Sequence, residues 1–235
     1  MASDKPIAVM QRYELKYLLT PEQTDRLKSA LKGHMEVDQY GMTSIASLYY
    51  DTPDHHLIRE SIDKPAFKEK IRLRSYGLAT KDSPVYLELK RKAEGIVYKR
   101  RVSSTIDDVN DFFAKGETIY ANRQIAKEIS YFRDYYRNLA PACLIIYDRE
   151  AYYEKDGDLR LTIDHNPRYR VQDLNLTTSM EGTSLLPQGY TVLEIKVQQA
   201  MPMWLSKILA DERIYQGSFS KYGEAYKQQS RLLGA

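Results

Sequence analysis

Lysine and arginine recur two residues apart in several short segments of this sequence, each time alternating with apolar residues. In one segment Lys70, Arg72 and Arg74 alternate with Ile71 and Leu73. Other segments place charged or polar residues together in the same way: Arg12, Glu14 and Lys16; Glu88, Lys90 and Lys92; Lys99 and Arg101; Arg160, Thr162 and Asp164; and Glu194 and Lys196. Because successive side chains of a strand point to opposite faces, each segment predicts a strand with one apolar and one charged face.

A charged face of this kind is usually the solvent side of an antiparallel sheet. Here, however, basic side chains two residues apart lie about 7 Å from one another, and at an effective dielectric constant of about 20 they repel by roughly 2–3 kcal/mol before screening. Repeating that repulsion on several strands is unfavourable unless an anion lies between them. Arginine offers paired donors to phosphate oxygens and lysine a point charge, so we interpret these faces as a binding site for a phosphate polyanion.

Carboxylates also occur on the charged faces, at Glu14, Glu88, Asp164 and Glu194. We expect Glu88 and Asp164 mainly to pair with neighbouring basic residues. Two or more carboxylates that face a bound phosphate are a usual site for Mg²⁺ or Mn²⁺. The sequence contains no P-loop and no kinase signature, so phosphate binding would not depend on a glycine-rich loop.

Several segments have strand character, namely 12–19, 45–50, 70–76, 85–92, 96–102, 143–153, 159–164, 168–172 and 190–197. Tight turns at Glu94-Gly95 and Asp156-Gly157 join successive segments, which favours antiparallel pairing. Helices are predicted over 20–31, 54–63, 121–137, 202–214 and 222–233. If the apolar stripes of these helices cover the apolar faces of the strands, the charged faces point inward. We therefore expect a mainly β (α+β) fold, an antiparallel eight-stranded closed barrel or tunnel with peripheral helices.

The composition fits a globular protein, with 235 residues, 43% of them hydrophobic and 29% charged, and we expect a single domain over residues 1–235. The net charge of +3 is too small to indicate nucleic-acid binding. The first residues lack the apolar segment of a signal peptide, and no apolar run approaches the roughly 20 residues that span a bilayer. Cys143 is the only cysteine, which excludes an internal disulfide. These features predict a cytoplasmic protein.

A series of short motifs follows in order along the chain: Arg12-Tyr-Glu-Leu-Lys-Tyr-Leu18, Ser47-Leu-Tyr-Tyr-Asp-Thr52, Lys70-Ile-Arg-Leu-Arg-Ser-Tyr76, Leu87-Glu-Leu-Lys-Arg-Lys92, Lys99-Arg-Arg101, Tyr147-Asp-Arg-Glu-Ala-Tyr152, Leu159-Arg-Leu-Thr-Ile-Asp164, Val192-Leu-Glu-Ile-Lys196 and Ser220-Lys-Tyr222. Taken together, this ordered set resembles the VTC domain, a polyphosphate polymerase of the triphosphate tunnel metalloenzyme (CYTH-like) superfamily. The resemblance implies an eight-stranded antiparallel tunnel with helices outside and a divalent metal ion. It also implies transfer of the γ-phosphate of ATP onto a growing polyphosphate chain.

The resemblance also implies roles for individual residues. The catalytic set is Lys16, Arg72, Arg74, Lys90, Arg149 and Lys196, and the substrate-binding set is Lys99, Arg101, Arg160, Ser220 and Lys221. Glu194 would hold the metal ion, Mn²⁺ or Mg²⁺, and the place of Glu14 in the first-strand motif makes it a second ligand. Hydrolases of the superfamily typically show Glu-x-Glu-x-Lys in that motif. Arg12 replaces the first glutamate here, which favours the polymerase.

Two other functions are compatible with the same residues. One is an inorganic triphosphatase or related phosphohydrolase that uses the same tunnel, and the other is a non-catalytic module that only binds polyphosphate. Nucleic acid is the least favoured ligand, because it needs an open basic surface with exposed aromatic residues. The expected ligands are therefore ATP and polyphosphate. The resemblance alone further implies a membrane-protein partner, which would hold the protein at the cytoplasmic face of a membrane.

Overall fold

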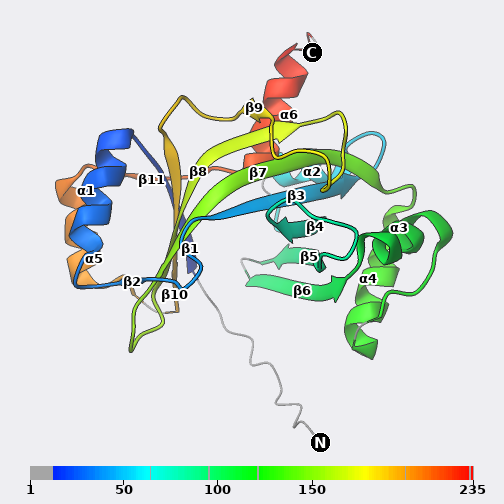
Figure 1. Ribbon diagram of the computed structural model, residues 1–235, viewed down its shortest axis with the longest axis horizontal. Helices are drawn as coiled ribbons and strands as arrows, with labels where there is room; N and C mark the ends of the chain where they lie inside the picture. The colour runs from blue at the N-terminus through cyan, green and yellow to red at the C-terminus, as the bar shows by residue number, and fades with distance from the viewer. Residues whose placement is uncertain are drawn as a thin grey trace, which may run out of the picture.

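The strands form one antiparallel sheet that curves around a central space (Figure 1). The computed structural model describes residues 13–63, 65–94, 96–120, 122–198, 200–232 and 234. The strands are β1 (Tyr13–Leu19), β2 (Glu36–Val37), β3 (Thr43–Asp51), β4 (Phe67–Tyr76), β5 (Val85–Ala93), β6 (Ile96–Ser104), β7 (Ala140–Tyr153), β8 (Arg160–Arg170), β9 (Thr183–Ser184), β10 (Thr191–Val197) and β11 (Gln216–Gly217). Their order is β11-β1-β10-β8-β7-β3-β4-β5-β6, with β2 paired to β7 and β9 to β8. The expected mainly β, antiparallel architecture is confirmed.

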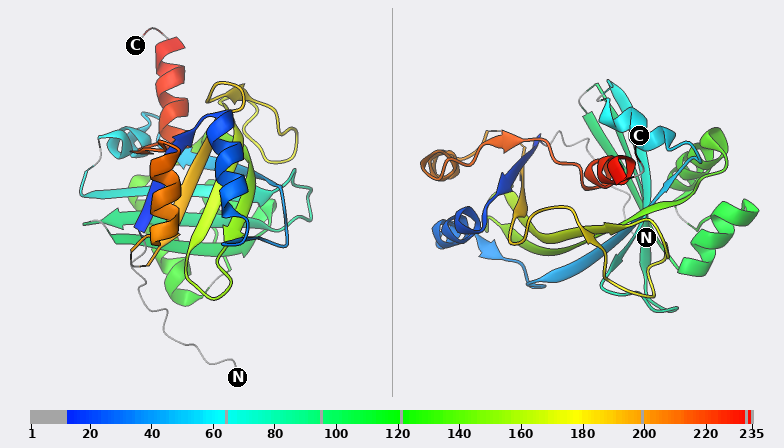
Figure 2. Two further views of the ribbon diagram at one scale, coloured as in Figure 1. Left: turned by 90° about the vertical axis from the view of Figure 1, so that its left-hand side faces the viewer. Right: turned by 90° about the horizontal axis from the view of Figure 1, so that it is seen from above.

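The expected closed barrel is not confirmed, because the sheet is open between its two edges. Within the described ranges β6 pairs only with β5, and β11 pairs only with β1. The two-residue strand β11 is too short to extend the ladder across to β6. The start of helix α6 (Lys221–Leu232) lies in this gap (Figure 2). Lys16 Nζ of β1 donates to the Phe219 carbonyl at 3.2 Å, and Lys70 Nζ of β4 donates to Ser220 Oγ at 3.3 Å.

Four helices cover the outer, apolar side of the sheet, and three of them lie where the sequence predicts a helix (Figure 2). Helices α1 (Pro21–Leu31) and α5 (Met203–Asp211) bury Leu27 and Leu205 against the apolar residues of β1, β8 and β10. Helices α3 (Ile106–Lys115) and α4 (Arg123–Tyr136) bury Phe112 and Phe132 against those of β4, β5 and β6. The apolar side chains that these strands contribute to the two clusters point to the outer face, toward the helices. Because side chains alternate along a strand, the charged side chains point to the concave face.

Helix α6 departs from that arrangement by packing on the concave side. Together with α2 (His56–Ile62), it contributes Ile58 and Tyr222 to an apolar cluster that includes Tyr49, Ile145 and Tyr147 of β3 and β7. The expectation that the helices lie on the periphery is therefore wrong for α6. No helix of the described segments combines the length and the apolar composition that a membrane crossing needs.

Two further elements differ from the sequence prediction. Helix α3 was not predicted, although Thr105 caps it by accepting from the Asp108 N–H at 3.1 Å and Gly116 ends it with a φ of 74°. The predicted strands 159–164 and 168–172 are one strand, β8, which bends where Asn166 adopts a φ of 46°. Arg12 and Gly95, named in the predicted first strand and hairpin, lie outside the described residues.

The buried carboxylate of Asp51 joins α2 and α6 to the end of β3. Asp51 is 1% exposed. Its oxygens accept hydrogen bonds from the N–H groups of Leu57 and Ile58 at 2.9 and 3.0 Å and from the Tyr222 hydroxyl at 2.8 Å. One side chain therefore accepts hydrogen bonds from free N–H groups in the first turn of α2 and from a side chain in the first turn of α6, and so holds the two helices together.

We expect Asp51→Ala to lower the free energy of unfolding by about 3 kcal/mol, because it leaves several buried donors without an acceptor. Urea denaturation measures this loss. The matched control is Asp54→Ala on the same loop, where the carboxylate is exposed, and we expect it to change stability by less than about 0.5 kcal/mol. Equal effects of the two variants would contradict the role of Asp51.

Candidate functional site

The charged faces of the strands meet on the concave side of the sheet, and we call the space between them the lumen. The lumen cations are Lys16 of β1, Lys70, Arg72 and Arg74 of β4, Lys90 of β5, Lys99 and Arg101 of β6, Arg149 of β7, Lys196 of β10 and Lys221 of α6. The lumen carboxylates are Glu14, Glu88, Asp164 and Glu194. Among the described residues these cations outnumber the carboxylates by more than two to one, so the lumen is strongly basic.

Glu88 of β5 lies at the centre of one cationic cluster and is 1% exposed. Arg72 donates to its Oε2 from Nε at 2.9 Å and lies 2.8 Å away at Nη2, while Lys99 Nζ lies 2.7 Å from Oε1. Arg74 and Arg101 approach the same carboxylate to 3.7 Å. Burial opposes the ionisation of Glu88, but Arg72, Arg74 and Lys99 outweigh it and lower its pKa to about 2.

Asp164 of β8 holds a second cluster on the other side of the lumen. Arg149 of β7 makes a two-pronged contact with it, from Nε at 2.6 Å and from Nη2 at 2.8 Å. Lys221 of α6 also donates to this carboxylate. Burial raises the pKa of Asp164, but Lys221 and Arg149 have the larger combined effect and lower it to about 2. Asp164 therefore stays ionised and holds both cations in the lumen.

Glu14 and Glu194 lie on the neighbouring strands β1 and β10. Glu14 is opposite Lys196 in the ladder, and Lys16 is opposite Glu194. Lys196 Nζ lies 2.6 Å and Lys16 Nζ 3.9 Å from Glu194, whereas Glu14 reaches across the lumen to Lys90 Nζ at 3.0 Å. Burial raises the pKa of Glu194, but Lys196 and Lys16 outweigh this effect and lower it.

Glu14 and Glu194 could provide part of the site for the metal ion that the resemblance implies. Glu14 and Glu194 are diagonal neighbours on one face of the sheet. The described residues contain no group of three or more acidic, histidine or cysteine side chains that could enclose a metal ion. Mg²⁺ is usually held by one or two carboxylates together with substrate phosphates and water, so this donor pair suits an ion that binds with its substrate.

Two lumen tyrosines were missed by the sequence analysis. The Tyr49 hydroxyl accepts from Arg72 Nη1 at 2.8 Å, and the Tyr147 hydroxyl accepts from Arg74 Nη2 at 3.2 Å. Burial raises the pKa of both phenols, but the surrounding cations outweigh it, and the pKa of each is lowered. Their signal in the sequence is positional, because Tyr147 lies two residues before Arg149 and so shares its face.

Most of the predicted site residues are brought together in the lumen, but Arg160 is not. The Arg160 guanidinium is bound to carbonyls of the turn before β8, including Leu159 at 3.0 Å and Glu154 at 3.4 Å. It makes no ion pair with the lumen carboxylates among the described residues. Ser220, by contrast, lies at the start of α6 and contacts Lys70.

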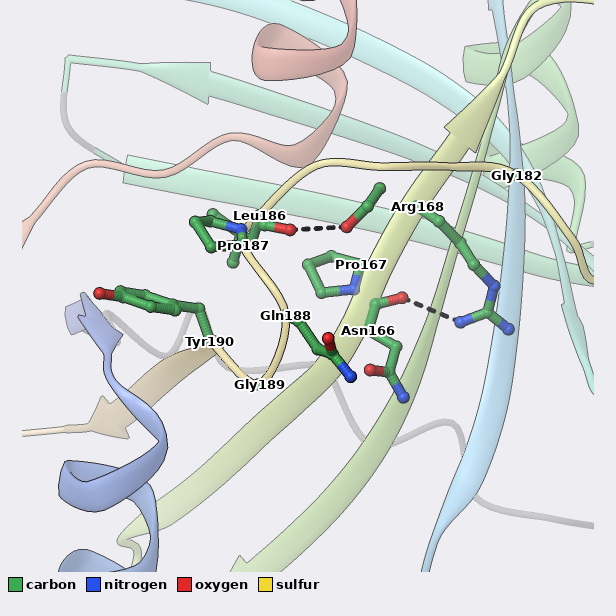
Figure 3. A pocket seen from close by; sticks show the side chains of 10 residues that line it. Asn166, Pro167, Arg168, Gly182, Leu186, Pro187, Gln188, Gly189 and Tyr190 are labelled. Atoms are coloured by element: carbon green, nitrogen blue, oxygen red, sulfur yellow. Dashed lines mark hydrogen bonds between the residues drawn. The ribbon is translucent and has the colours of Figure 1, made fainter.

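A separate pocket of about 320 Å³ lies between the loop before β10 and the bend of β8 (Figure 3). Arg168 is its cationic residue, and its guanidinium is occupied by the carbonyls of Met180 and Asn166 at 2.6 and 2.9 Å and by Asp148 at 3.1 Å. None of the predicted site residues lines this pocket. The lumen is therefore the candidate functional site.

Solved structures with similar folds match this chain over most of its length, although their sequence identity is low. A candidate adenylate cyclase from Bacillus halodurans is 14% identical, with 90% of this chain and 96% of that chain covered and a TM-score of 0.55. A candidate adenylyl cyclase from Hippeastrum, described as having a dominant triphosphatase activity, is 18% identical, with coverage of 91% and 93% and a TM-score of 0.51. These likenesses show a shared fold.

The family follows from the sequence itself. The model of the VTC domain family matches residues 11–229, so the chain belongs to the VTC domain family. None of the curated proteins matches this sequence.

We expect Glu88→Gln to lower the free energy of unfolding at neutral pH by about 3–5 kcal/mol, because it leaves the buried Arg74 and the partly buried Arg72 without their carboxylate. The folded-state pKa of Glu88 is about 2, below its unfolded value. Glu88 thus stabilises the protein at pH values above the unfolded pKa, and this contribution disappears as the pH falls through the folded pKa. The variant should therefore lose less stability than the wild type between about pH 5 and pH 2.

Urea denaturation at several pH values measures both effects. Glu224→Gln on α6 is the control, since its carboxylate forms only a surface pair with Lys227. An acid sensitivity of Glu88→Gln equal to that of the wild type would contradict the assignment.

Proposed function

We propose that this protein is a polyphosphate polymerase that transfers the γ-phosphate of ATP onto a growing inorganic polyphosphate chain in the lumen. The observation that carries this proposal is the excess of cations on the concave face, contributed by strands on facing walls of the sheet (Figure 2). A linear polyanion can contact facing walls at once, which a flat polyanion cannot do. Membership of the VTC domain family supports the same ligand.

The lumen residues supply what phosphoryl transfer needs. The terminal phosphate of the acceptor chain is already an anionic nucleophile, so the reaction requires positioning and charge neutralisation more than a strong base. Arg72 and Arg74 of β4 provide guanidinium donors, and Arg149 of β7 provides another. These groups would reduce repulsion between the two phosphates and stabilise the charge that spreads over the transferring group.

Glu194 and Glu14 would hold the divalent ion of the proposed mechanism. When bound, the ion would supply additional neutralisation of the phosphate oxygens. Lys196 and Lys16 form ion pairs with the Glu194 carboxylate. If this carboxylate bound the metal ion instead, both ammonium groups would be free to bind phosphate oxygens of the substrate.

A triphosphatase is the second candidate, favoured by the dominant triphosphatase activity described for the structurally similar Hippeastrum protein. Hydrolysis would use the same cations, with water in place of the acceptor phosphate. A polyphosphate-binding module without turnover is the third candidate. The proposal also includes a cytoplasmic location, on the ground of the sequence features, and a membrane-protein partner, on the ground of family membership alone.

Incubation of the protein with ATP and Mn²⁺ separates these functions. We expect long polyphosphate chains, detected on a polyacrylamide gel, whereas free phosphate without chains would identify a triphosphatase. Arg72→Ala should lower the rate by about 100-fold, because it removes a preorganised donor to the transferring phosphate. Arg100→Ala is the matched control, since Arg100 lies on the same sheet but pairs with Glu128 of α4 on the outer side, and it should retain activity.

Glu194→Gln tests the role of the proposed metal ligand. We expect turnover with Mn²⁺ to fall by about 100-fold, while affinity for polyphosphate without metal is retained or increased, because a negative charge has left the lumen. Glu150→Gln is the control, since this carboxylate pairs with Lys28 of α1 outside the lumen. Isothermal titration with polyphosphate and a rate assay give the two readouts. Unchanged turnover in Glu194→Gln would exclude Glu194 as a metal ligand.

A further inference from the structure

Lys70 differs from the other lumen cations in its partners. Its Nζ donates to Ser220 Oγ at 3.3 Å and lies 6.0 Å from the centroid of the Tyr222 ring. Within the described ranges, every other lumen cation lies within 4.0 Å of a carboxylate oxygen, whereas Lys70 forms no ion pair. Lys70 was part of the charged face in the sequence but has no role assigned by the family motifs.

The position of Lys70 in the sheet makes this lack of a carboxylate unfavourable. In the ladder between β4 and β5, Lys70 lies directly opposite Lys90, and like charges in such positions repel. Lys90 is compensated by Glu14 at 3.0 Å. Lys16 of β1 approaches the same region, because its Nζ donates to the carbonyl of Phe219, the residue before Ser220. Three lysines from different strands therefore converge near the start of α6, with one of them uncompensated.

We propose that Lys70 is a further phosphate-binding residue of this site, and that its ammonium group binds a phosphate oxygen of a tripolyphosphate or polyphosphate chain beside the Ser220 hydroxyl. The inference rests on the proposed function, since it requires an inorganic phosphate chain in the lumen. A phosphate in this position relieves the repulsion between Lys70 and Lys90. It also gives Lys70 the anionic partner that the other lumen cations already have.

The protonation of Lys70 gives this role a pH dependence. The pKa of Lys70 is lowered to about 8, mainly by burial and also by Lys68, Lys16 and Lys90, while Tyr49 acts in the opposite direction. The other group that faces it is Tyr222 on α6. A lysine with a lowered pKa is charged below that value and neutral above it, so phosphate binding should weaken as the pH rises through about 8. A bound phosphate favours the charged form, so binding near this pH takes up a proton.

Isothermal titration with inorganic tripolyphosphate between about pH 6.5 and about pH 9.5, without metal, tests the proposal. Lys70→Gln should weaken binding at about pH 7 by about tenfold, because it removes a charged hydrogen-bond donor to the phosphate. Lys70→Arg should bind about as tightly as the wild type at pH 7 and more tightly than the wild type above about pH 9, since arginine stays charged. Titration of the ligand itself affects all variants equally, so Lys70→Arg also corrects for it.

Lys127→Gln is the matched control, because it removes the same charge from an exposed lysine of α4, on the outer side of the sheet. If the wild type does not bind tripolyphosphate, the proposed function is wrong and this inference falls with it. If the wild type binds but Lys70→Gln and Lys127→Gln weaken binding equally, only the role of Lys70 is overturned. Lys70→Gln is not essential for this decision. If the affinity for tripolyphosphate falls with pH equally steeply in the wild type and in Lys70→Arg above about pH 8, the role of Lys70 is overturned even where Lys70→Gln does not fold.

Discussion

Repulsion among the lysines and arginines of the concave face is the constraint on which this structure depends. The curved sheet brings basic side chains from facing strands together. Glu14, Glu88, Asp164 and Glu194 are distributed among these side chains, so that nearly every lumen cation has a carboxylate partner. Glu88 contacts cations of β4 and β6, and Asp164 connects β7 to α6. Without these buried acids the folded state would contain a large uncompensated charge at low dielectric.

The apolar parts of the molecule place this charge on the inside. Helices α1, α3, α4 and α5 bury the outer faces of the strands, which leaves the concave face for the charged residues. Helix α6 completes the wall at the gap between the sheet edges, and its Tyr222 stacks on Tyr49 with ring centroids 4.6 Å apart. Because Tyr49 also accepts a hydrogen bond from Arg72, one pair of rings joins the apolar cluster under α6 to the cationic cluster around Glu88.

Local patterns in the sequence predicted the strands and their charged faces, because alternation of side chains is a property of each strand by itself. The same reasoning could not predict closure, which depends on how edge strands far apart in the sequence meet. The two-residue strand β11 and the insertion of α6 into the gap have no local signature. Arg160 shows a related limit: it lies on the correct face, but it is the first residue of β8, where nearby turn carbonyls capture its guanidinium.

The ion pairs of the lumen also set a condition on what can bind there. A ligand must draw cations away from carboxylates that already hold them, so the first phosphate contacts replace existing interactions and add little net free energy. Orthophosphate offers too few oxygens to exchange several pairs at once, whereas each further phosphate of a chain engages another cation along the same walls. Affinity should therefore rise steeply with the number of linked phosphates, and the lumen would discriminate its ligands by chain length.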